Sequence, residues 1–304
     1  MNPKLLKIFE MKTVILSAVL ALLFLTNSVC SQSVNNTHRI QDSLSKLSSI
    51  IWKQKTDSSR LQANYIFIEK FRSVLESASY ADIAFDSING ITRIASADGK
   101  FRVFTWNVPI SDGTNKYFGF IQITGDSPAL IPLQSTGIEP SGFDSEQFTS
   151  SMWYGAIYYK LIEVEIGGQK AYTLLGWDGY TANSNRKFID IVTYDKKGTI
   201  TFGLPVFKTE KGIKTRVVLE YAEKANMLLR YDYQAILVEK RKKIKKENTW
   251  LIVMDRMVPM DPSMEGFRKY YVPTGDTYDG YIFRDGYWTL VENIEVANKS
   301  NSTK

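Results

Sequence analysis

The sequence contains very little histidine and cysteine, and this scarcity excludes several kinds of chemistry. Among its 304 residues there is one histidine, His38, and one cysteine, Cys30. A zinc site made of histidines and cysteines, a di-iron site or a CxxC redox pair needs more of these residue types. We therefore expect no metal site and no bound cofactor.

The single histidine also weakens the case for nucleophilic catalysis. A Ser-His-Asp triad uses histidine as its proton carrier, but His38 lies in a polar stretch ahead of the first expected helix. A surface histidine is the simpler interpretation there, and a thiol-based triad would require His38 and Cys30 to meet. Ser-Lys catalysis stays open, although no S-x-x-K stands out in a suitable setting, and carboxylates are the acid–base groups that the composition supplies most readily.

Long apolar runs are also scarce, and the main one lies near the start of the chain. It extends from Val14 to Leu25, follows Lys12 and precedes the polar residues 26–28. This is the order of regions in a secretory signal. Twelve residues at about 1.5 Å each span roughly 18 Å, short of a bilayer core of about 30 Å. We expect a signal peptide over 1–31 and no transmembrane helix in the mature chain.

Two processing routes follow from the residues after the apolar run. Cleavage after Ser31 leaves Gln32 as the new terminus, and this route to soluble export is favoured. The alternative is a lipoprotein anchored through Cys30, but Val29 fits poorly before a lipidated cysteine. We expect an exported protein of the periplasm, outer membrane or medium, which under the first route has no cysteine and no disulfide.

An N-terminal helical region is expected over 32–80. Apolar residues recur there at helical spacing in two segments separated by Asp57-Ser58-Ser59, which supplies N-cap chemistry. The pattern predicts a helical hairpin, with Trp52 and Phe71 at its seam with the next layer. The expected core positions are Ile40, Leu44, Leu47, Ile51, Leu61, Tyr65, Ile68 and Leu75.

A large antiparallel β meander is expected over 81–297, because short turn signals separate runs of Val, Ile, Tyr, Phe and Trp. So many strands exceed a usual open sheet, which favours a twisted sandwich or an irregular barrel. The fold class is therefore α+β, mainly β. The expected strands are 101–108, 116–124, 154–166, 169–177, 187–195, 200–207, 214–221, 228–239, 249–257, 280–284 and 287–293.

One hairpin has a register that the sequence alone specifies. With Gly167-Gly168 in the turn, Ile166 faces Gln169, and Glu165 faces Lys170 as a pair of opposite charges. Elsewhere, the stretch 125–152 is rich in Pro, Gly and Ser and is the best candidate for an internal break or domain boundary. The polar tail 298–304 is expected to fray.

Carboxylates near the middle of the chain offer one catalytic hypothesis. Glycoside hydrolysis needs two Asp or Glu side chains and no metal, and the stretch 176–186, expected as a loop, adds aromatic residues that suit a sugar. The catalytic candidates are Asp178, Asp190 and Glu163, and the ligand-binding candidates are Trp153, Trp177 and Tyr180. The same loop has oxygen ligands for Ca²⁺ but lacks the EF-hand spacing, so turn chemistry is favoured.

A basic run over 239–247 is the main charge feature. It lies between two apolar strands, which indicates a hairpin tip in solvent. Its cations are candidates for binding an anionic polymer or envelope glycan, whereas nucleic acid is disfavoured because no aromatic residues interleave with them. These cations are Lys240, Arg241, Lys242, Lys243, Lys245 and Lys246.

A resemblance rests on two aromatic blocks. One joins Tyr278-Asp279-Gly280 to the turn Asp285-Gly286 and to Trp288, and the other is Trp-Tyr-Gly-Ala-Ile-Tyr-Tyr-Lys over 153–160. In these blocks the chain resembles uncharacterised exported proteins of Gram-negative bacteria. The resemblance implies export and a shared fold, and it carries no activity, cofactor or site residue.

The signal, the scarcity of cofactor ligands and a β scaffold with loops favour binding over catalysis, and the balance of charge places any electrostatic partner at the basic run. Without residues 1–31 the chain has 35 basic and 31 acidic residues, and the run 239–247 alone holds six cations and two anions. The rest of the β body is therefore neutral. We expect an exported, non-catalytic binding or cell-envelope-associated protein of unknown ligand and partner. The alternative is a carboxylate-dependent hydrolase of an envelope or extracellular polysaccharide.

Overall fold

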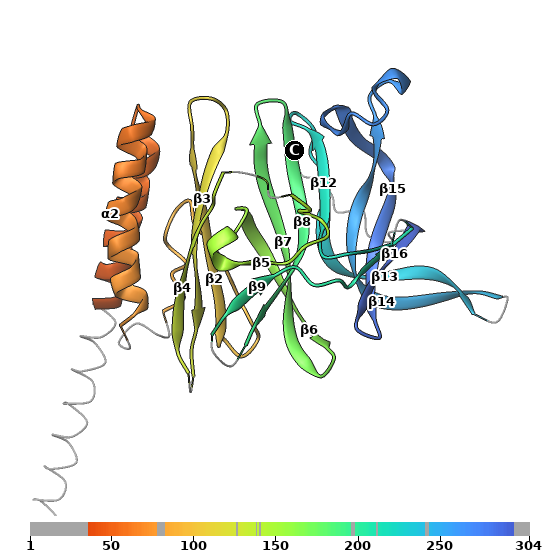
Figure 1. Cartoon of the computed structure of the whole chain (residues 1–304), viewed down its shortest axis with the longest axis horizontal. Helices are drawn as coiled ribbons and strands as arrows, with labels where there is room; N and C mark the ends of the chain where they lie inside the picture. The colour runs from red at the N-terminus through yellow and green to blue at the C-terminus, as the bar shows by residue number, and fades with distance from the viewer. Residues whose placement is uncertain are drawn as a thin grey trace, which may run out of the picture.

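A helical layer and three β-sheets stack along the long axis of the molecule (Figure 1). This computed structural model describes residues 36–77, 83–125, 127–137, 139, 141–195, 198–210, 212–240 and 243–294, with side chains omitted over 237–245. The expected signal peptide, Cys30 and the tail 298–304 lie outside the described residues.

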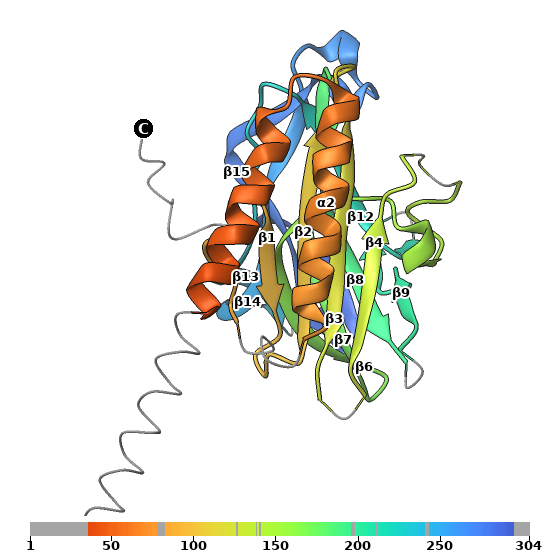
Figure 2. The ribbon, with the colours of Figure 1, turned by 90° about the vertical axis from the view of Figure 1, so that its left-hand side faces the viewer.

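The helical layer consists of a first helix, described over 36–53, and α2 (Asp57–Leu75), which lie side by side over the first sheet (Figure 2). Thr56 caps α2, because its hydroxyl accepts a hydrogen bond from the Ser59 amide at 3.2 Å. The side chains that face the sheet are fully or nearly fully buried: Leu44, Ile51, Phe67, Phe71 and Val74.

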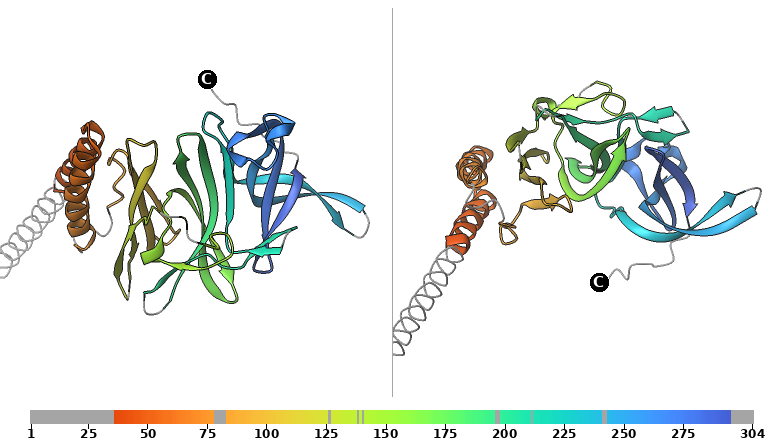
Figure 3. Two further views of the ribbon diagram at one scale, coloured as in Figure 1. Left: turned by 45° about the horizontal axis from the view of Figure 1, so that its top comes forward. Right: turned by 90° about the horizontal axis from the view of Figure 1, so that it is seen from below.

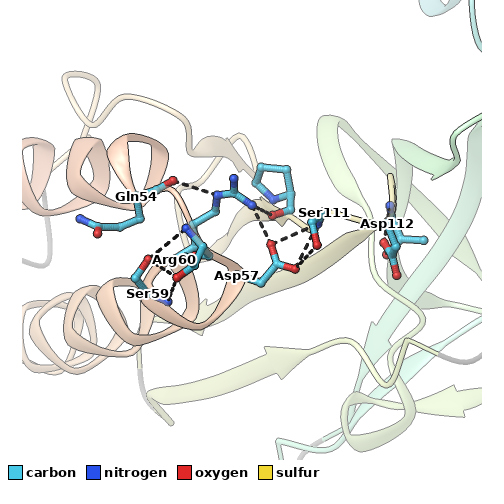
Figure 4. Close-up of polar contacts among 9 residues, drawn as sticks. Gln54, Asp57, Ser59, Arg60, Ser111 and Asp112 are labelled. Atoms are coloured by element: carbon cyan, nitrogen blue, oxygen red, sulfur yellow. Dashed lines mark hydrogen bonds and ion pairs between the residues drawn. The ribbon is translucent and has the colours of Figure 1, made fainter.

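Polar contacts fix the start of α2 to the first sheet (Figure 4). The Asp57 carboxylate accepts hydrogen bonds from the Ser111 amide at 3.1 Å and the Ser111 hydroxyl at 2.5 Å. Arg60 donates to Asp57 at 2.8 Å and to the Pro109 carbonyl at 3.1 Å. The hydrogen bonds from Ser111 lower the pKa of Asp57.

The first sheet is an antiparallel meander in the order β1-β2-β3-β4. Alternate side chains of its strands face the helices and the second sheet, so Phe104 and Phe120 join one core while Phe101 and Ile121 join the other. Because both faces are covered, β2 and β3 are buried along almost their whole length. The strands are β1 (Thr92–Ala95), β2 (Phe101–Pro109), β3 (Asn115–Ile123) and β4 (Ala129–Gln134).

The second sheet occupies the middle of the stack and follows the order β5-β9-β8-β7-β6, with β12 paired to the other half of the β8 edge. Its faces pack against the first and third sheets. Its strands are β5 (Phe148–Thr149), β6 (Ile157–Ile166), β7 (Gln169–Thr181), β8 (Ser184–Tyr194), β9 (Ile200–Phe202) and β12 (Val217–Ala222).

The third sheet follows the order β11-β10-β16-β15-β14-β13. Its β13–β14 hairpin extends away from the rest of the molecule (Figure 3). The strands are β10 (Phe207–Thr209), β11 (Gly212–Lys214), β13 (Leu229–Lys240), β14 (Lys243–Pro259), β15 (Tyr271–Arg284) and β16 (Tyr287–Ile294). Short 3₁₀ turns are η2 (Ser150–Met152), η3 (Pro262–Met264) and η4 (Arg268–Tyr270).

This architecture confirms the predicted class: two helices precede mainly antiparallel sheets that stack as in a sandwich. The predicted register of the β6–β7 hairpin is also confirmed, with Ile166 opposite Gln169 and Glu165 opposite Lys170. One pairing departs from the antiparallel expectation, because β10 runs parallel to β16.

Other details of the sequence analysis are wrong. The expected loop 176–186 is almost entirely strand, because β7 and β8 continue to Thr181 and Ser184. The stretch 125–152 is not a loop throughout, because it contains β4, while a domain boundary within it stays a prediction. Tyr65 was expected in the core and is 49% exposed, and Trp52 was expected at the seam and is 45% exposed.

Candidate functional site

Asp178, the first catalytic candidate, lies between the first and second sheets, where it accepts two tyrosine hydrogen bonds. Tyr117 and Tyr154 each donate a phenolic hydrogen bond to its carboxylate at 2.7 Å. Asp178 is 3% exposed, and burial raises its pKa, although the tyrosine hydrogen bonds oppose that rise. The carboxylate is thus bound inside the protein, where it orders the two tyrosines.

Arg186 neighbours this carboxylate on β8, directly opposite Asp178 in the sheet register. Its guanidinium contacts the carboxylates of Glu139 and Glu220, the latter at 3.6 Å. It also lies over the ring of Tyr180, 3.4 Å from the ring centroid. Tyr180, a ligand-binding candidate, therefore has one face covered by Arg186.

Asp190, the second catalytic candidate, forms a buried ion pair with Arg216. The Arg216 Nε atom lies 3.2 Å from Asp190, and the Arg216 side chain is only 1% exposed. Arg216 also donates to the backbone carbonyls of Phe143 and Glu146, which fixes the segment after β4 against the second sheet. Burial raises the pKa of Asp190, and the charge of Arg216 acts against that rise.

The space beside this ion pair is too small for a sugar. Asp190, Arg216, Trp153 and several aromatic rings line a cavity of about 10 Å³, which holds about one water molecule. Trp153, another ligand-binding candidate, is 2% exposed and donates its indole hydrogen to Tyr158 at 3.1 Å. Trp153 is therefore part of the core.

The structure does not bring the carboxylate candidates together. Asp190 is four residues along β8 from the register partner of Asp178, about 13 Å at the usual rise per residue. Paired glycosidase carboxylates lie roughly 5 to 9.5 Å apart. Glu163 lies elsewhere, where it accepts a hydrogen bond from the Ala97 amide at 2.5 Å and pairs with Lys170 at 3.4 Å.

An exposed aromatic cluster lies on the β13–β14 hairpin, at a position that sequence analysis missed. Tyr233 and Trp250 face each other across the two strands and are 51% and 53% exposed. The Trp250 ring contacts Tyr233 and stacks on Tyr231, with centroid distances of 5.6 and 5.1 Å. We call Tyr231, Tyr233 and Trp250 the aromatic platform.

The aromatic platform is joined to the core of the third sheet by ring contacts. Tyr231 meets the edge of Trp288 at a centroid distance of 6.4 Å. Trp288 is fully buried and donates its indole hydrogen to Thr173 of the second sheet at 3.0 Å. The outer rings are thus supported by a rigid interior and still present half of their surface to solvent.

The predicted hairpin at the basic run is confirmed, because β13 and β14 pair as far as Lys240 opposite Lys243. The side chains of Lys240, Lys243 and Lys245 and the whole of Arg241 and Lys242 lie outside the described residues, whereas Lys246 is described and exposed. Trp177, the remaining ligand-binding candidate, is half-buried on β7 opposite Lys187. Sequence analysis did not detect the aromatic platform because its rings come from two strands, β13 and β14, and meet only when the strands pair.

Comparison of the chain with protein-family models, with curated proteins and with solved structures gave no match. Across the residues that the structure describes, no helix is long and apolar enough to cross a membrane. The fold thus defines a class, a layered α+β protein with stacked sheets, and the function has to be argued from the geometry of the site.

Proposed function

We propose that this chain is an exported, non-catalytic binding protein of the cell envelope and that it binds glycans at the aromatic platform. The observation that carries the proposal is the half-exposed Tyr233–Trp250 pair on a hairpin that extends from the body. Large exposed aromatic side chains commonly mark a binding surface. Export is supported by the order of charged, apolar and polar residues in the first thirty positions.

The chemistry of the platform suits a sugar. A pyranose presents an apolar face of C–H groups and a rim of hydroxyls, so a flat ring covers the face while polar side chains nearby bind the rim. Tyrosine and tryptophan combine an apolar ring with a polar group that still reaches water. No comparable support exists for the hydrolase, because Asp178 and Asp190 are held in internal contacts and Glu163 is remote.

A glycan array tests the proposal. The purified mature chain is expected to bind at least one glycan, and Trp250→Ala is expected to lose that binding while it keeps the wild-type circular dichroism spectrum. Trp52→Ala is the matched control, because Trp52 is also about half exposed but lies in the helical layer. A reducing-end assay on each bound glycan checks for turnover, and sustained release of sugar ends would contradict a non-catalytic role.

Export is tested separately by the intact mass of the protein recovered from the periplasm or medium. We expect a chain that begins at Gln32. A diacylated or triacylated Cys30 would establish the lipoprotein alternative, and an uncleaved chain in the cytoplasm would contradict export.

A further inference from the structure

We infer that the glycan bound at the aromatic platform is acidic, with a sugar ring on Trp250 and an anionic group at Lys246. This inference rests on the proposed function and adds the charge class of the ligand. It uses only described side chains of the hairpin, and it assigns a binding role to Asn248 and Lys246 next to the rings.

The register of the hairpin places these side chains in one row. Tyr233 pairs with Trp250, Ala235 with Asn248 and Leu237 with Lys246, without a shift in register. Because side chains alternate across a strand, Trp250, Asn248 and Lys246 project from the same face, with successive members about 7 Å apart. All three are exposed. An aromatic ring, an amide and an ammonium therefore follow one another along β14.

The row offers complementary chemistry to an acidic sugar. Asn248 supplies both a donor and an acceptor for hydroxyls, and Lys246 supplies a point charge with three donors. The neighbouring Glu247 belongs to the opposite face, where it accepts a hydrogen bond from Arg284 at 2.6 Å. The side chains of Asn248 and Lys246 have no ion pair or hydrogen bond to other described residues. Among the residues whose side chains the structure describes, none therefore neutralises the exposed Lys246 ammonium.

The size and layout of the row favour a sugar chain over other occupants. A stable protein interface buries roughly 800 Å² on each partner, far more than two half-exposed rings provide. Single-stranded nucleic acid is bound by aromatic side chains on which successive bases stack. Here the rings contact one another, with centroids 5.1 and 5.6 Å apart, and form one stacking position.

Calorimetric titration with a short galacturonate oligosaccharide and with its methyl ester tests the inference. The two ligands share the sugar ring and differ in charge. We expect the acid to bind more tightly than the ester, and the difference to shrink as salt is added. Lys246→Gln should weaken binding of the acid by about 2- to 5-fold and leave the ester unchanged.

Trp250→Ala should weaken both ligands by about tenfold or more, by analogy with bases that stack on aromatic residues. Trp52→Ala and Lys53→Gln are the matched controls, since both side chains are exposed in the helical layer, and neither should change binding. Because Lys246 is exposed, Lys246→Gln should fold normally, and it keeps the test valid even if Trp250→Ala is unstable.

The outcomes separate the two proposals. Equal binding of acid and ester, unaffected by Lys246→Gln, would overturn the acidic ligand and leave glycan binding intact. If the wild-type chain binds neither the acid nor the ester and also binds no glycan on the array, both proposals are overturned. Tighter binding of a single-stranded oligonucleotide than of any glycan would assign the row to nucleic acid instead and also overturn both.

Discussion

At the scale of single residues, the buried charges of this protein serve structure. Asp178 and Asp190 look like catalytic carboxylates in the sequence, because they flank a hairpin rich in aromatic residues. In the structure Asp178 accepts hydrogen bonds from Tyr117 and Tyr154, and Asp190 pairs with Arg216. Sequence could not reveal this, because each partner is at least 24 residues away along the chain.

Arg216→Met should destabilise the protein by about 3 to 5 kcal/mol, because it leaves Asp190 as an unpaired charge in the core. Replacing both members, as in Arg216→Met with Asp190→Leu, should recover much of that loss, because neither charge of this pair then remains in the core. Urea titration followed by circular dichroism gives the free energies of unfolding. A double variant no more stable than the single one would show that Arg216 acts mainly through the backbone carbonyls that it contacts.

Asp98 makes stability depend on pH in the acid range. Hydrogen bonds from the Ser96 hydroxyl and the Lys100 amide, at 2.6 and 3.0 Å, lower the pKa of Asp98 from 3.8 to about 2. A carboxylate with a lowered pKa stabilises the folded state above its unfolded pKa and loses that effect as the pH falls. The advantage of the wild type over Asp98→Asn should therefore vanish between about pH 4 and pH 2.

Urea titrations of the wild type and of Asp98→Asn at several pH values measure this advantage. The carboxylate is partly exposed, so its effect should also decrease in high salt. A difference in unfolding free energy that stays constant down to pH 2 would mean that the turn depends on the shape of Asp98 and not on its charge.

At the scale of elements, sequence analysis correctly predicted the helices and strands whose local residue pattern matches their environment in the fold. The β6–β7 hairpin was predicted in register, because its Gly-Gly turn and paired charges act locally. Strand β4 was missed because Pro132 argues against a strand, yet β4 is the edge of its sheet, where a residue without an amide hydrogen is tolerated. The side of α2 that faces the core was predicted wrongly, because a polar residue, Asn64, lies on it. Asn64 is buried there and accepts a hydrogen bond from Trp106.

The N-terminus of α2 provides a test at this scale. Thr56→Ala should destabilise the protein by about 1 kcal/mol, because the hydroxyl that caps the Ser59 amide is lost. Ser58→Ala is the control, since Ser58 is exposed in the first turn and should change stability little. Thermal unfolding monitored by circular dichroism measures both variants, and equal losses would show that the cap contributes no more than the helix propensity of the sequence.

At the scale of the whole molecule, each pair of neighbouring layers encloses a common hydrophobic core. The second sheet contributes one face to the core with the first sheet and the other to the core with the third sheet. Individual hydrogen bonds also cross between layers, from the Tyr158 amide to Thr105 at 2.9 Å and from Trp288 to Thr173 at 3.0 Å. Removing any one layer would expose the apolar face of the next.

We therefore predict a single cooperative unfolding transition, although the sequence suggests a break at 125–152. Tryptophans report on different layers: Trp106 lies between helices and sheet, Trp153 between the first two sheets and Trp288 between the last two. Their combined near-ultraviolet signal and the far-ultraviolet backbone signal should lose intensity at the same urea concentration. Two separated transitions would instead divide the chain into domains, and Arg216→Met would then shift only the transition that contains the second sheet.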